Sequence, residues 1–333
     1  RRVGAIAASI VVGAAMLVGC TTTAADPATS GSSTESSAEV KAPTEIKAGF
    51  SWYVTHPVTK KWAQGIEEFL NSQEDFKVDF KVFDPNAKAD VQVQQVQTMT
   101  ADDYDVIFLQ PIDSAALAAP VEAARKAGVI VVTLNIDVSA VHAAHITQPH
   151  VKFSQEVGRQ MAAQLKAQGN VWMVTNAQGT DIYNKRVQGF KDGLGSGPKI
   201  VGETVLEGAD RKSALDAFAP VLQGDQQIDA IWCINDDIAV GVVQALKEAG
   251  KTAIVWGDGD GDRDAIAAVA AGEMSGTVFT DLANQGNIAA AAALSYFRAG
   301  LTGAEIPLQA VVDVPFMIVT KDNAATIPLD RQA

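Results

Sequence analysis

Two polar side chains, an amide and a carboxylate, follow two short apolar runs that succeed one another in the chain. Asn235 comes directly after residues 230–234, and Asp258 follows residues 253–256 with one glycine between. Runs of this length predict buried strands, and the helical spacing between them predicts a strand–helix–strand unit of a parallel sheet. Ligands of open α/β sheets bind beyond the carboxyl ends of the strands, so both side chains should face one crevice. An amide and a carboxylate can each bridge neighbouring hydroxyls, which suits a polyhydroxylated ligand.

The elements that must position these residues alternate between strand and helix along most of the chain. Strands are expected at 45–50, 77–83, 105–109, 129–134, 145–147, 171–175, 199–206, 230–234, 253–256, 276–280 and within 311–319. Helices are expected between most of them, including 113–126, 151–167, 181–194, 211–222 and 283–298. The series occurs twice, and 333 residues exceed what one core usually serves. The sequence therefore predicts the α/β class with two lobes.

Residues 1–43 have the composition of targeting and tether segments. Arg1 and Arg2 precede an apolar run at 3–18, and Leu-Val-Gly-Cys at 17–20 is similar to a bacterial lipobox. This pattern predicts a signal peptide at 1–19 and a lipidated Cys20. Residues 20–43 are rich in Ser, Thr, Ala and Pro and predict a disordered tether. The protein is thus expected outside the cytoplasm, lipid-anchored to the outer face of the bacterial cell membrane. The alternative is a membrane anchor that is never cleaved, but the apolar run is short for a helix that spans a membrane.

Composition and missing motifs exclude several functions. A formal net charge of −13 disfavours nucleic acid as a partner. The sequence has no Gly-x-Ser-x-Gly elbow, no phosphate-binding P-loop and no dinucleotide fingerprint after the first strand. We therefore predict neither an enzyme nor a cofactor. Cys233, inside an apolar run, is expected to be an inert core thiol.

Two stretches, one rich in aspartate and one rich in histidine, are candidates for a metal-binding site. Asp-Gly-Asp-Gly-Asp at 258–262 begins like a calcium loop, but Arg263 and Val269 occupy the positions that require Gly and Glu. His142, His145 and His150 are too loosely spaced for a typical metal site and are expected at the surface or in a hinge. No metal site is predicted.

Motifs spread along the body resemble those of type I periplasmic sugar-binding proteins of the ribose-binding branch. The resemblance runs from about residue 46 to 319 and rests on His-Pro at 56–57, Gln-Pro-Ile-Asp-Ser at 110–114, Val-Thr-Leu-Asn at 132–135, Lys-Arg-Val-Gln-Gly-Phe at 185–190, Ile-Asn-Asp-Asp at 234–237 and Val-Trp-Gly-Asp-Gly at 255–259. It implies two Rossmann-like lobes, each a parallel sheet flanked by helices, joined by a three-segment hinge with the ligand in the interlobe cleft. Residues 44–148 plus 282–312 would form one lobe, and residues 149–281 plus 313–333 the other.

The resemblance also implies a set of ligand contacts. These are His56, Gln110, Asn135, Asn184, Asn235, Asp258 and Thr280. The chain departs from the pattern at Val58, Thr59 and Ala209, where the branch has aromatic residues, and at Ile136 and Asn184, where it has arginines. Tyr53, Trp62 or Tyr183 can supply a replacement face for stacking on the ligand.

The function implied by the resemblance is capture of a sugar, sugar alcohol or related polyol by hinge closure. The liganded protein, expected to be a monomer, would then deliver its ligand to the membrane permease of an ABC importer. A sensory module that presents ligand to a membrane receptor is an alternative that uses the same closure. A secreted glycosidase is a third possibility and would need two carboxylates about 5–10 Å apart across the scissile bond.

Overall fold

The computed structural model describes residues 44–176, 178 and 180–333; the predicted signal peptide, Cys20 and the tether lie outside these residues. The described strands are β1 (Thr44–Ser51), β2 (Phe76–Phe83), β3 (Val106–Leu109), β4 (Ile130–Leu134), β5 (Ala144–Thr147), β6 (Asn170–Asn176), β7 (Lys199–Leu206), β8 (Ala230–Cys233), β9 (Ile254–Gly257), β10 (Thr277–Thr280), β11 (Ala310–Asp313) and β12 (Phe316–Val319). The described α-helices are α1 (Pro57–Asn71), α2 (Ala89–Ala101), α3 (Ala118–Lys126), α4 (His150–Gln164), α5 (Asp181–Leu194), α6 (Arg211–Phe218), α7 (Asp236–Glu248), α8 (Arg263–Ala271) and α9 (Leu282–Arg298).

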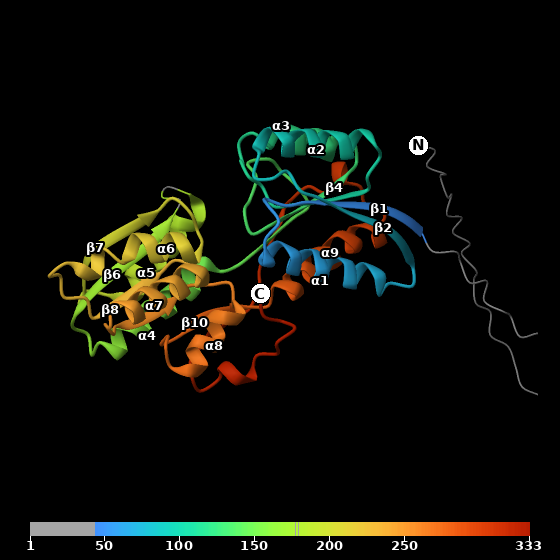
Figure 1. The fold of residues 1–333 in the computed structure, drawn as a ribbon. Helices are drawn as coiled ribbons and strands as arrows, with labels where there is room; N and C mark the ends of the chain where they lie inside the picture. The colour runs from blue at the N-terminus through green and yellow to red at the C-terminus, as the bar shows by residue number, and fades with distance from the viewer. Residues whose placement is uncertain (1–43, 177, 179) are drawn as a thin grey trace, which may run out of the picture. The chain divides into compact units, whose positions relative to one another are not determined.

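A parallel sheet with helices on both faces forms what we call the first lobe. Its six strands have the order β11-β5-β4-β3-β1-β2. Figure 1 shows α2 and α3 on one side of this sheet and α1 and α9 on the other. Strand β3 serves both faces: Val106 and Phe108 pack in the cluster under α1 and α9, whereas Ile107 and Leu109 pack in the cluster with Met99 of α2. This alternation follows from the two-residue period of a strand.

Helices α1 and α9 approach so closely that glycine is required at their contact. A Cβ atom on Gly65 would lie 1.8 Å from the carbonyl oxygen of Ala283, and one on Gly286 would lie 2.2 Å from that of Trp62. The indole Nε1 of Trp62 donates to Gln285 Oε1 at 2.9 Å, and Gln285 Nε2 donates to the carbonyl oxygen of Ile146 at 3.0 Å. The start of α1 is therefore held firmly against α9 and the end of β5.

The second lobe, made of the remaining strands with α4 to α8, has a mixed sheet. Strands β7-β6-β8-β9 are parallel, β10 continues them through a parallel bridge between Trp256 and Gly276, and β12 pairs antiparallel with β10. The core of this lobe contains Trp232 stacked on Phe190, with ring centroids 4.5 Å apart. Cys233 lies buried in the same core as a free thiol. The predicted α/β class with two lobes is confirmed.

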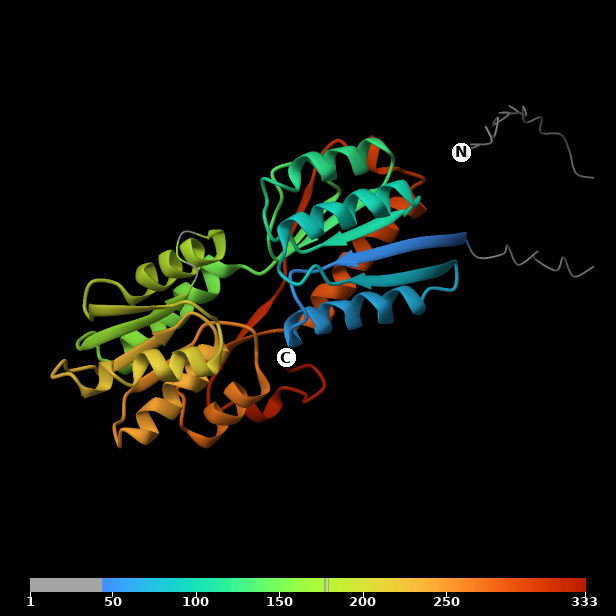
Figure 2. The ribbon, with the colours of Figure 1, turned by 45° about the horizontal axis from the view of Figure 1, so that its top comes forward.

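The described chain passes between the lobes at three places. They lie between β5 and α4, between β10 and α9, and between β11 and β12. Figure 2 shows the green segment after β5 and the red segment around β11 and β12 running from one lobe to the other. At the second passage Asp281 accepts a hydrogen bond from the backbone of Asn284 and pairs with Arg331 at 2.6 Å. The passage between β10 and α9 is therefore braced by a residue near the end of the described chain.

Two predicted elements were wrong in their limits. The helix expected from residue 113 begins at Ala118, because Asp113 Oδ1 accepts hydrogen bonds from the backbones of Ala115 and Ala116 and closes a turn first. The last expected strand, within 311–319, is two strands in different sheets. Pro315 separates them, since proline has no N–H to continue a ladder.

Candidate functional site

A cavity of about 550 Å³ lies between the two lobes, where strands of both sheets end. From the first lobe it is lined by residues that follow β1, β3 and β4; from the second, by residues at the ends of β6, β8 and β9 and at the start of α5. The polar or aromatic residues among them are Tyr53, His56, Thr59, Trp62, Gln110, Ser114, Asn135, Asn176, Thr180, Asp181, Tyr183, Arg186, Asn235 and Asp260. The position agrees with the rule that ligands of parallel sheets bind at the carboxyl edge.

Most of the residues predicted from the sequence come together in this cavity. Those that line it are Tyr53, His56, Gln110, Asn135, Tyr183 and Asn235. Among the described residues, Asn184, Asp258 and Thr280 do not line it. Asn184 is exposed on α5, whereas Asp258 and Thr280 are fully buried. Ligand contact stays a prediction for all nine residues, and for these three the structure gives no place in the cavity lining.

Two amide side chains of the cavity have their orientation set by backbone donors. Gln110 Oε1 accepts from the backbone N–H of Tyr53 at 3.1 Å, and Asn235 Oδ1 accepts from the backbone N–H of Ile238 at 2.9 Å. A backbone N–H can only donate, so in both amides the oxygen is the engaged acceptor. The NH2 group of Asn235 also donates to the carbonyl oxygen of Ala209 at 3.4 Å, which leaves one of its two N–H donors for the cavity. Asn235 also caps α7 by this bond. Capping and presentation of a donor are therefore compatible at this position.

Arg186 was interpreted from the sequence as a structural ion-pairing residue, and its place beside Asp260 agrees with that interpretation. Its position in the cavity lining, with only 5% of its surface exposed, was not predicted. Its guanidinium donates to the carbonyl oxygen of Ile234 at 2.5 Å and lies 3.8 Å from Asp260 Oδ1. Gly259 makes room for it, because a Cβ atom there would lie 2.8 Å from the guanidinium. The signal in the sequence was an arginine beside Val187 and Phe190, two apolar residues that pack in the core of the second lobe.

Asn176, Thr180 and Asp260 also line the cavity and were not predicted. Asn176 ends β6, so the strand-end rule that found Asn235 could have found it as well. Thr180 caps α5 by accepting from the backbone of Tyr183 at 3.2 Å. Asp260 has a φ of 84° in the turn after β9, a conformation that local sequence did not reveal.

Two accessible aromatic side chains, Tyr53 and Tyr183, and one fully buried aromatic side chain, Trp62, lie at the cavity. Tyr53, with 38% of its surface exposed, Trp62 and Tyr183 all line it. The hydroxyl of Tyr183 donates to Glu203 at 3.0 Å, which holds this ring from outside. Val58 and Ala209, which stand where the resembled branch has aromatics, line the cavity too. Tyr53 and Tyr183 therefore offer accessible aromatic surface at the cavity, and stacking on a ligand stays a prediction.

The acidic loop after β9 uses its carboxylates within the protein. Asp262 caps α8 and accepts from Arg211 at 3.1 Å, and Asp258 accepts from the indole of Trp232 at 3.1 Å. Among the described residues, no group of three or more His, Cys, Asp or Glu is arranged to hold a metal ion. The three histidines expected at the surface or in a hinge are buried, so the surface is excluded for them. His150 lies at the passage after β5, in the hinge, whereas His142 and His145 both bond to the hydroxyl of Thr133.

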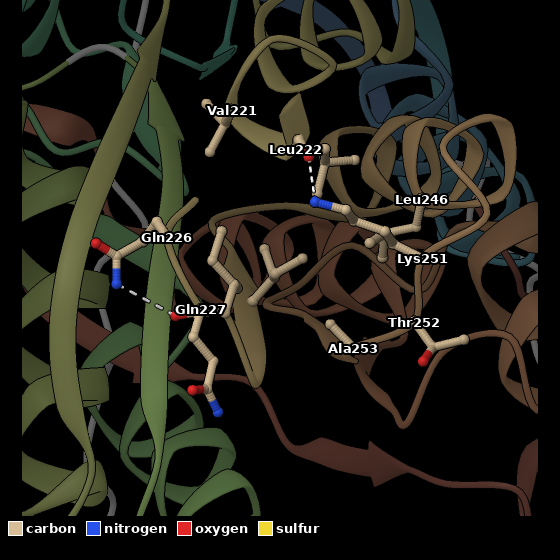
Figure 3. Close-up of a pocket in the computed structure, with 10 residues that line it drawn as sticks. Val221, Leu222, Gln226, Gln227, Leu246, Lys251, Thr252 and Ala253 are labelled. Atoms are coloured by element: carbon tan, nitrogen blue, oxygen red, sulfur yellow. Dashed lines mark hydrogen bonds between the residues drawn. The ribbon is translucent and has the colours of Figure 1, made fainter. Parts of the chain in front are cut away.

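A second, smaller cavity of about 200 Å³ lies in the second lobe (Figure 3). Its lining includes residues 226–228, directly before β8, and residues 251–253, directly before β9. It therefore lies at the amino-terminal edge of the sheet, opposite to the edge where ligands of this fold bind. Lys251 donates to the carbonyl oxygen of Leu222 there (Figure 3), so its charge is engaged by the backbone. The interlobe cavity is the better candidate site.

His56 connects the two lobes at the mouth of the cavity. It caps α1, with its Nδ1 accepting from the backbone of Val58 at 3.3 Å. Its Nε2 lies 3.8 Å from Oδ2 of Asp237, in the first turn of α7 on the other lobe. This carboxylate raises the pKa of His56, and the imidazole in turn lowers the pKa of Asp237. The pair therefore favours contact between the lobes most strongly when His56 is charged.

Double-mutant analysis of His56→Gln and Asp237→Asn should reveal a coupling in unfolding free energy that depends on pH. The folded pKa of His56 is raised, so its contribution is complete below the unfolded value of about 6.5 and is lost as pH rises through the folded value. We expect a coupling of at most about 1 kcal/mol near pH 5.5, because the imidazole is half exposed. It should vanish near pH 8.5; equal couplings at both pH values would contradict the assignment.

Asp258 carries a second measurable consequence of burial. It is 0% exposed, and among the described residues its Oδ1 has no hydrogen-bond partner. Desolvation raises the pKa of Asp258 to about 7. Because this pKa is raised, there is a pH range in which the carboxyl group keeps its proton in the folded state but has lost it in the unfolded state. Stability from this group is therefore present at low pH and falls as pH rises from about 4 to about 7.

Asp258→Asn should consequently stabilise the ligand-free protein only at the higher pH. We expect little change in unfolding free energy near pH 4 and a gain approaching about 4 kcal/mol above pH 7, measured by chemical denaturation. Asp225→Asn, at an exposed aspartate, is the matched control and should show no such pH-dependent gain. A pH-independent effect of Asp258→Asn would refute the raised pKa.

Comparison with known proteins gives the family. A family model described as a periplasmic binding protein domain matches residues 49–301. A putative rhizopine-binding protein of Rhizobium meliloti is 28% identical over 78% of this chain and 85% of its own length. A xylitol-binding protein of Mycolicibacterium smegmatis is 27% identical over 72% and 67%. A D-allose-binding periplasmic protein of Escherichia coli is 32% identical over 59% and 66%.

Solved structures agree on the fold. An ABC transporter solute-binding protein from Bacillus halodurans with bound myo-inositol superposes with a TM-score of 0.74 at 21% identity, covering 85% of this chain and 97% of that one. A myo-inositol-binding protein of Caulobacter gives 0.72 at 24% identity, covering 84% and 95%. Among the described residues, no helix is long and apolar enough to cross a membrane. The chain belongs to the periplasmic binding protein family, whose members bind solutes outside the cytoplasm and are not enzymes.

Proposed function

We propose that this protein is the solute-binding component of an ABC importer and that its ligand is a sugar, a sugar alcohol or a related polyol. The observation that carries the proposal is the interlobe cavity, where amide groups from both lobes and the carboxylate of Asp260 converge. A hydroxyl both donates and accepts, so a polyol can satisfy amide NH2 groups and a carboxylate at once. The relatives named for binding rhizopine, xylitol and D-allose support the same ligand class.

Capture would proceed by closure of the lobes about the hinge. Residues 44–148 plus 282–312 would move against residues 149–281 plus 313–333. Gln110 and Asn135 would hold hydroxyls from the first lobe, and Asn235 and Arg186 from the second. For Asn184, Asp258 and Thr280 to contact the ligand, closure would have to bring these three residues to it as well. The liganded form would then dock on the membrane permease.

Family membership removes one alternative considered from the sequence. A secreted glycosidase would be an enzyme, whereas periplasmic binding proteins capture their solutes without turnover. The carboxylates near the cavity have other roles in this structure: Asp260 lies beside Arg186, and Asp181 pairs with Lys185 at 2.7 Å. Binding without chemistry is therefore the function to test.

Anchoring and oligomeric state are further parts of the proposal. We propose that residues 1–19 are removed, that Cys20 is lipidated at the outer face of the membrane, and that the protein acts as a monomer. The motivating feature is the Leu-Val-Gly-Cys sequence at 17–20. Metabolic labelling with palmitate should mark the wild-type protein, and Cys20→Ala should lose the label and leave the membrane fraction. Retention of label by Cys20→Ala would refute this part alone.

A thermal-shift screen of residues 44–333 against pentoses, hexoses, sugar alcohols, inositols and amino acids tests the ligand class. A ligand at a hundred times its dissociation constant should add about 2.7 kcal/mol to the unfolding free energy. We expect a clear shift with at least one polyol and none with amino acids. A shift from an amino acid with a flat response to every polyol would overturn the proposed ligand while leaving the family intact.

Two substitutions separate ligand contact from helix capping in the same screen. Asn235→Ser keeps an N-cap oxygen but removes the amide, so affinity should fall at least tenfold with stability nearly unchanged. Asn235→Ala removes both and should also lose about 1 kcal/mol of stability. Unchanged affinity in both variants would show that Asn235 only caps α7.

A further inference from the structure

His150 lies at the point where the chain first passes from one lobe to the other. It is the first residue of α4, directly after the passage that follows β5. Only 2% of its surface is exposed, and it does not belong to the described lining of the cavity. Its ring packs edge-to-face on Phe153, with centroids 5.3 Å apart. His150 is therefore a buried residue beneath the binding site.

Both nitrogens of its imidazole are engaged by residues that line the cavity. Arg186 Nε donates to His150 Nδ1 at 3.2 Å, and His150 Nε2 lies 3.0 Å from Asn135 Oδ1. Arg186 belongs to α5 of the second lobe, whereas Asn135 follows β4 of the first. One continuous hydrogen-bonded chain thus joins cavity residues of the two lobes through the hinge.

The direction of every hydrogen bond in this chain follows from the first one. A guanidinium has only donors, so Nδ1 of His150 must accept and carries no proton. A neutral imidazole then holds its proton on Nε2, which must donate to Asn135. The acceptor on Asn135 is its amide oxygen, so the NH2 group is the end left for the cavity. The orientation of Asn135 is therefore determined by Arg186, two residues away along the chain of bonds.

The neutral form of His150 is also the form that its surroundings favour. Burial holds the pKa of His150 well below its usual value, and the charge of Arg186 lowers it further, with smaller effects from Lys185 and His145. A protonated Nδ1 would place an N–H against the N–H of Arg186. The protein thus has both an electrostatic and a hydrogen-bonding reason to keep this ring neutral.

The backbone of Asn135 is constrained by the same region of the fold. Its φ is 63°, in the left-handed region that asparagine tolerates better than most residues. Its backbone N–H donates to the carbonyl oxygen of Ile146 at 2.9 Å, and its carbonyl oxygen accepts from the hydroxyl of Thr147 at 3.3 Å. Strand β5 therefore sets the backbone, and His150 sets the amide.

We propose that His150 is a positioning residue that presents Asn135 to the ligand as a hydrogen-bond donor. With Gln110 and Asn235 oriented by backbone N–H groups, the three amides then offer NH2 groups to the cavity. The site selects a ligand that places oxygen lone pairs, from hydroxyl, ether or ring oxygen, opposite these amides, and it disfavours an ammonium group there. This inference rests on the proposed function and specifies the chemistry of its ligand.

The first test needs no ligand. Long-range proton–nitrogen NMR of the ¹⁵N-labelled protein at pH 7 reports the protonation of each histidine ring, and the signals of His150 are those missing in His150→Phe. We expect a neutral ring with its proton on Nε2. A ring protonated on Nδ1, or on both nitrogens, would overturn the proposal, because Asn135 would then not receive the bond that orients it.

The second test asks whether His150 acts on binding through Asn135. Affinities for xylitol, D-allose and myo-inositol are measured by calorimetry for the wild type, His150→Phe, Asn135→Ala and the double variant. For a probe that binds, each single variant should lose about tenfold, and the double variant should bind no worse than Asn135→Ala. Losses that multiply in the double variant would show independent effects and overturn the proposal.

A matched control separates positioning from general damage to a buried histidine. His142 is also fully buried and bonds to Thr133 and to the backbone of Ala140, away from Asn135. His142→Phe should lower thermal stability and leave probe affinity unchanged; a loss of affinity equal to that of His150→Phe would contradict a specific role. If none of the three probes binds the wild type, the NMR result alone decides the role of His150, and the thermal-shift screen decides the polyol assignment.

Discussion

The buried guanidinium of Arg186 is the group on which the geometry of the binding site depends. A charge with 5% exposure must be surrounded by acceptors, and this one has the carbonyl oxygen of Ile234, the imidazole of His150 and the nearby carboxylate of Asp260. Each of these partners comes from a different element: the end of β8, the start of α4 and the turn after β9. Satisfying one cation therefore draws together segments that are far apart in the sequence and converge at the cavity.

The need to surround Arg186 with hydrogen-bond acceptors also explains how a hinge and a binding site can share residues. His150 belongs to the first passage between the lobes and transmits the donor character of Arg186 to Asn135. His56 and Asp237 provide a second contact between the lobes, at the start of α1 and of α7. The hinge, the contact between the lobes and the proposed ligand-binding groups are thus linked through side chains. In each of these side chains the donor and acceptor roles are largely fixed. When the lobes of such a protein close around a ligand, a change in how the lobes are arranged also changes how the ligand-binding side chains are oriented.

The interlobe cavity of this chain is lined by its own selection of residues. Val58 and Ala209 stand where the resembled branch has aromatics, and Tyr53 and Tyr183 are the accessible aromatic residues of the lining. Asn135 stands in a backbone conformation with positive φ and presents an amide. The polar lining combines four amide side chains and one buried cation with the carboxylates of Asp181 and Asp260 and with several hydroxyl groups.

The sequence by itself determined the strand–helix alternation, the α/β class and the strand-end positions of Gln110, Asn135 and Asn235, because apolar periodicity and turn residues are local signals. It could not determine the cavity roles of Arg186 and Asp260 or the burial of His150, since these depend on segments brought together from distant parts of the chain. The same limit applies to Asp258, whose strand-end position was evident while its burial against Trp232 was not. Only the tertiary structure decides which polar groups meet. The guanidinium of a buried arginine can only donate, and this fixes which partner is donor and which is acceptor in the hydrogen bonds that follow from it.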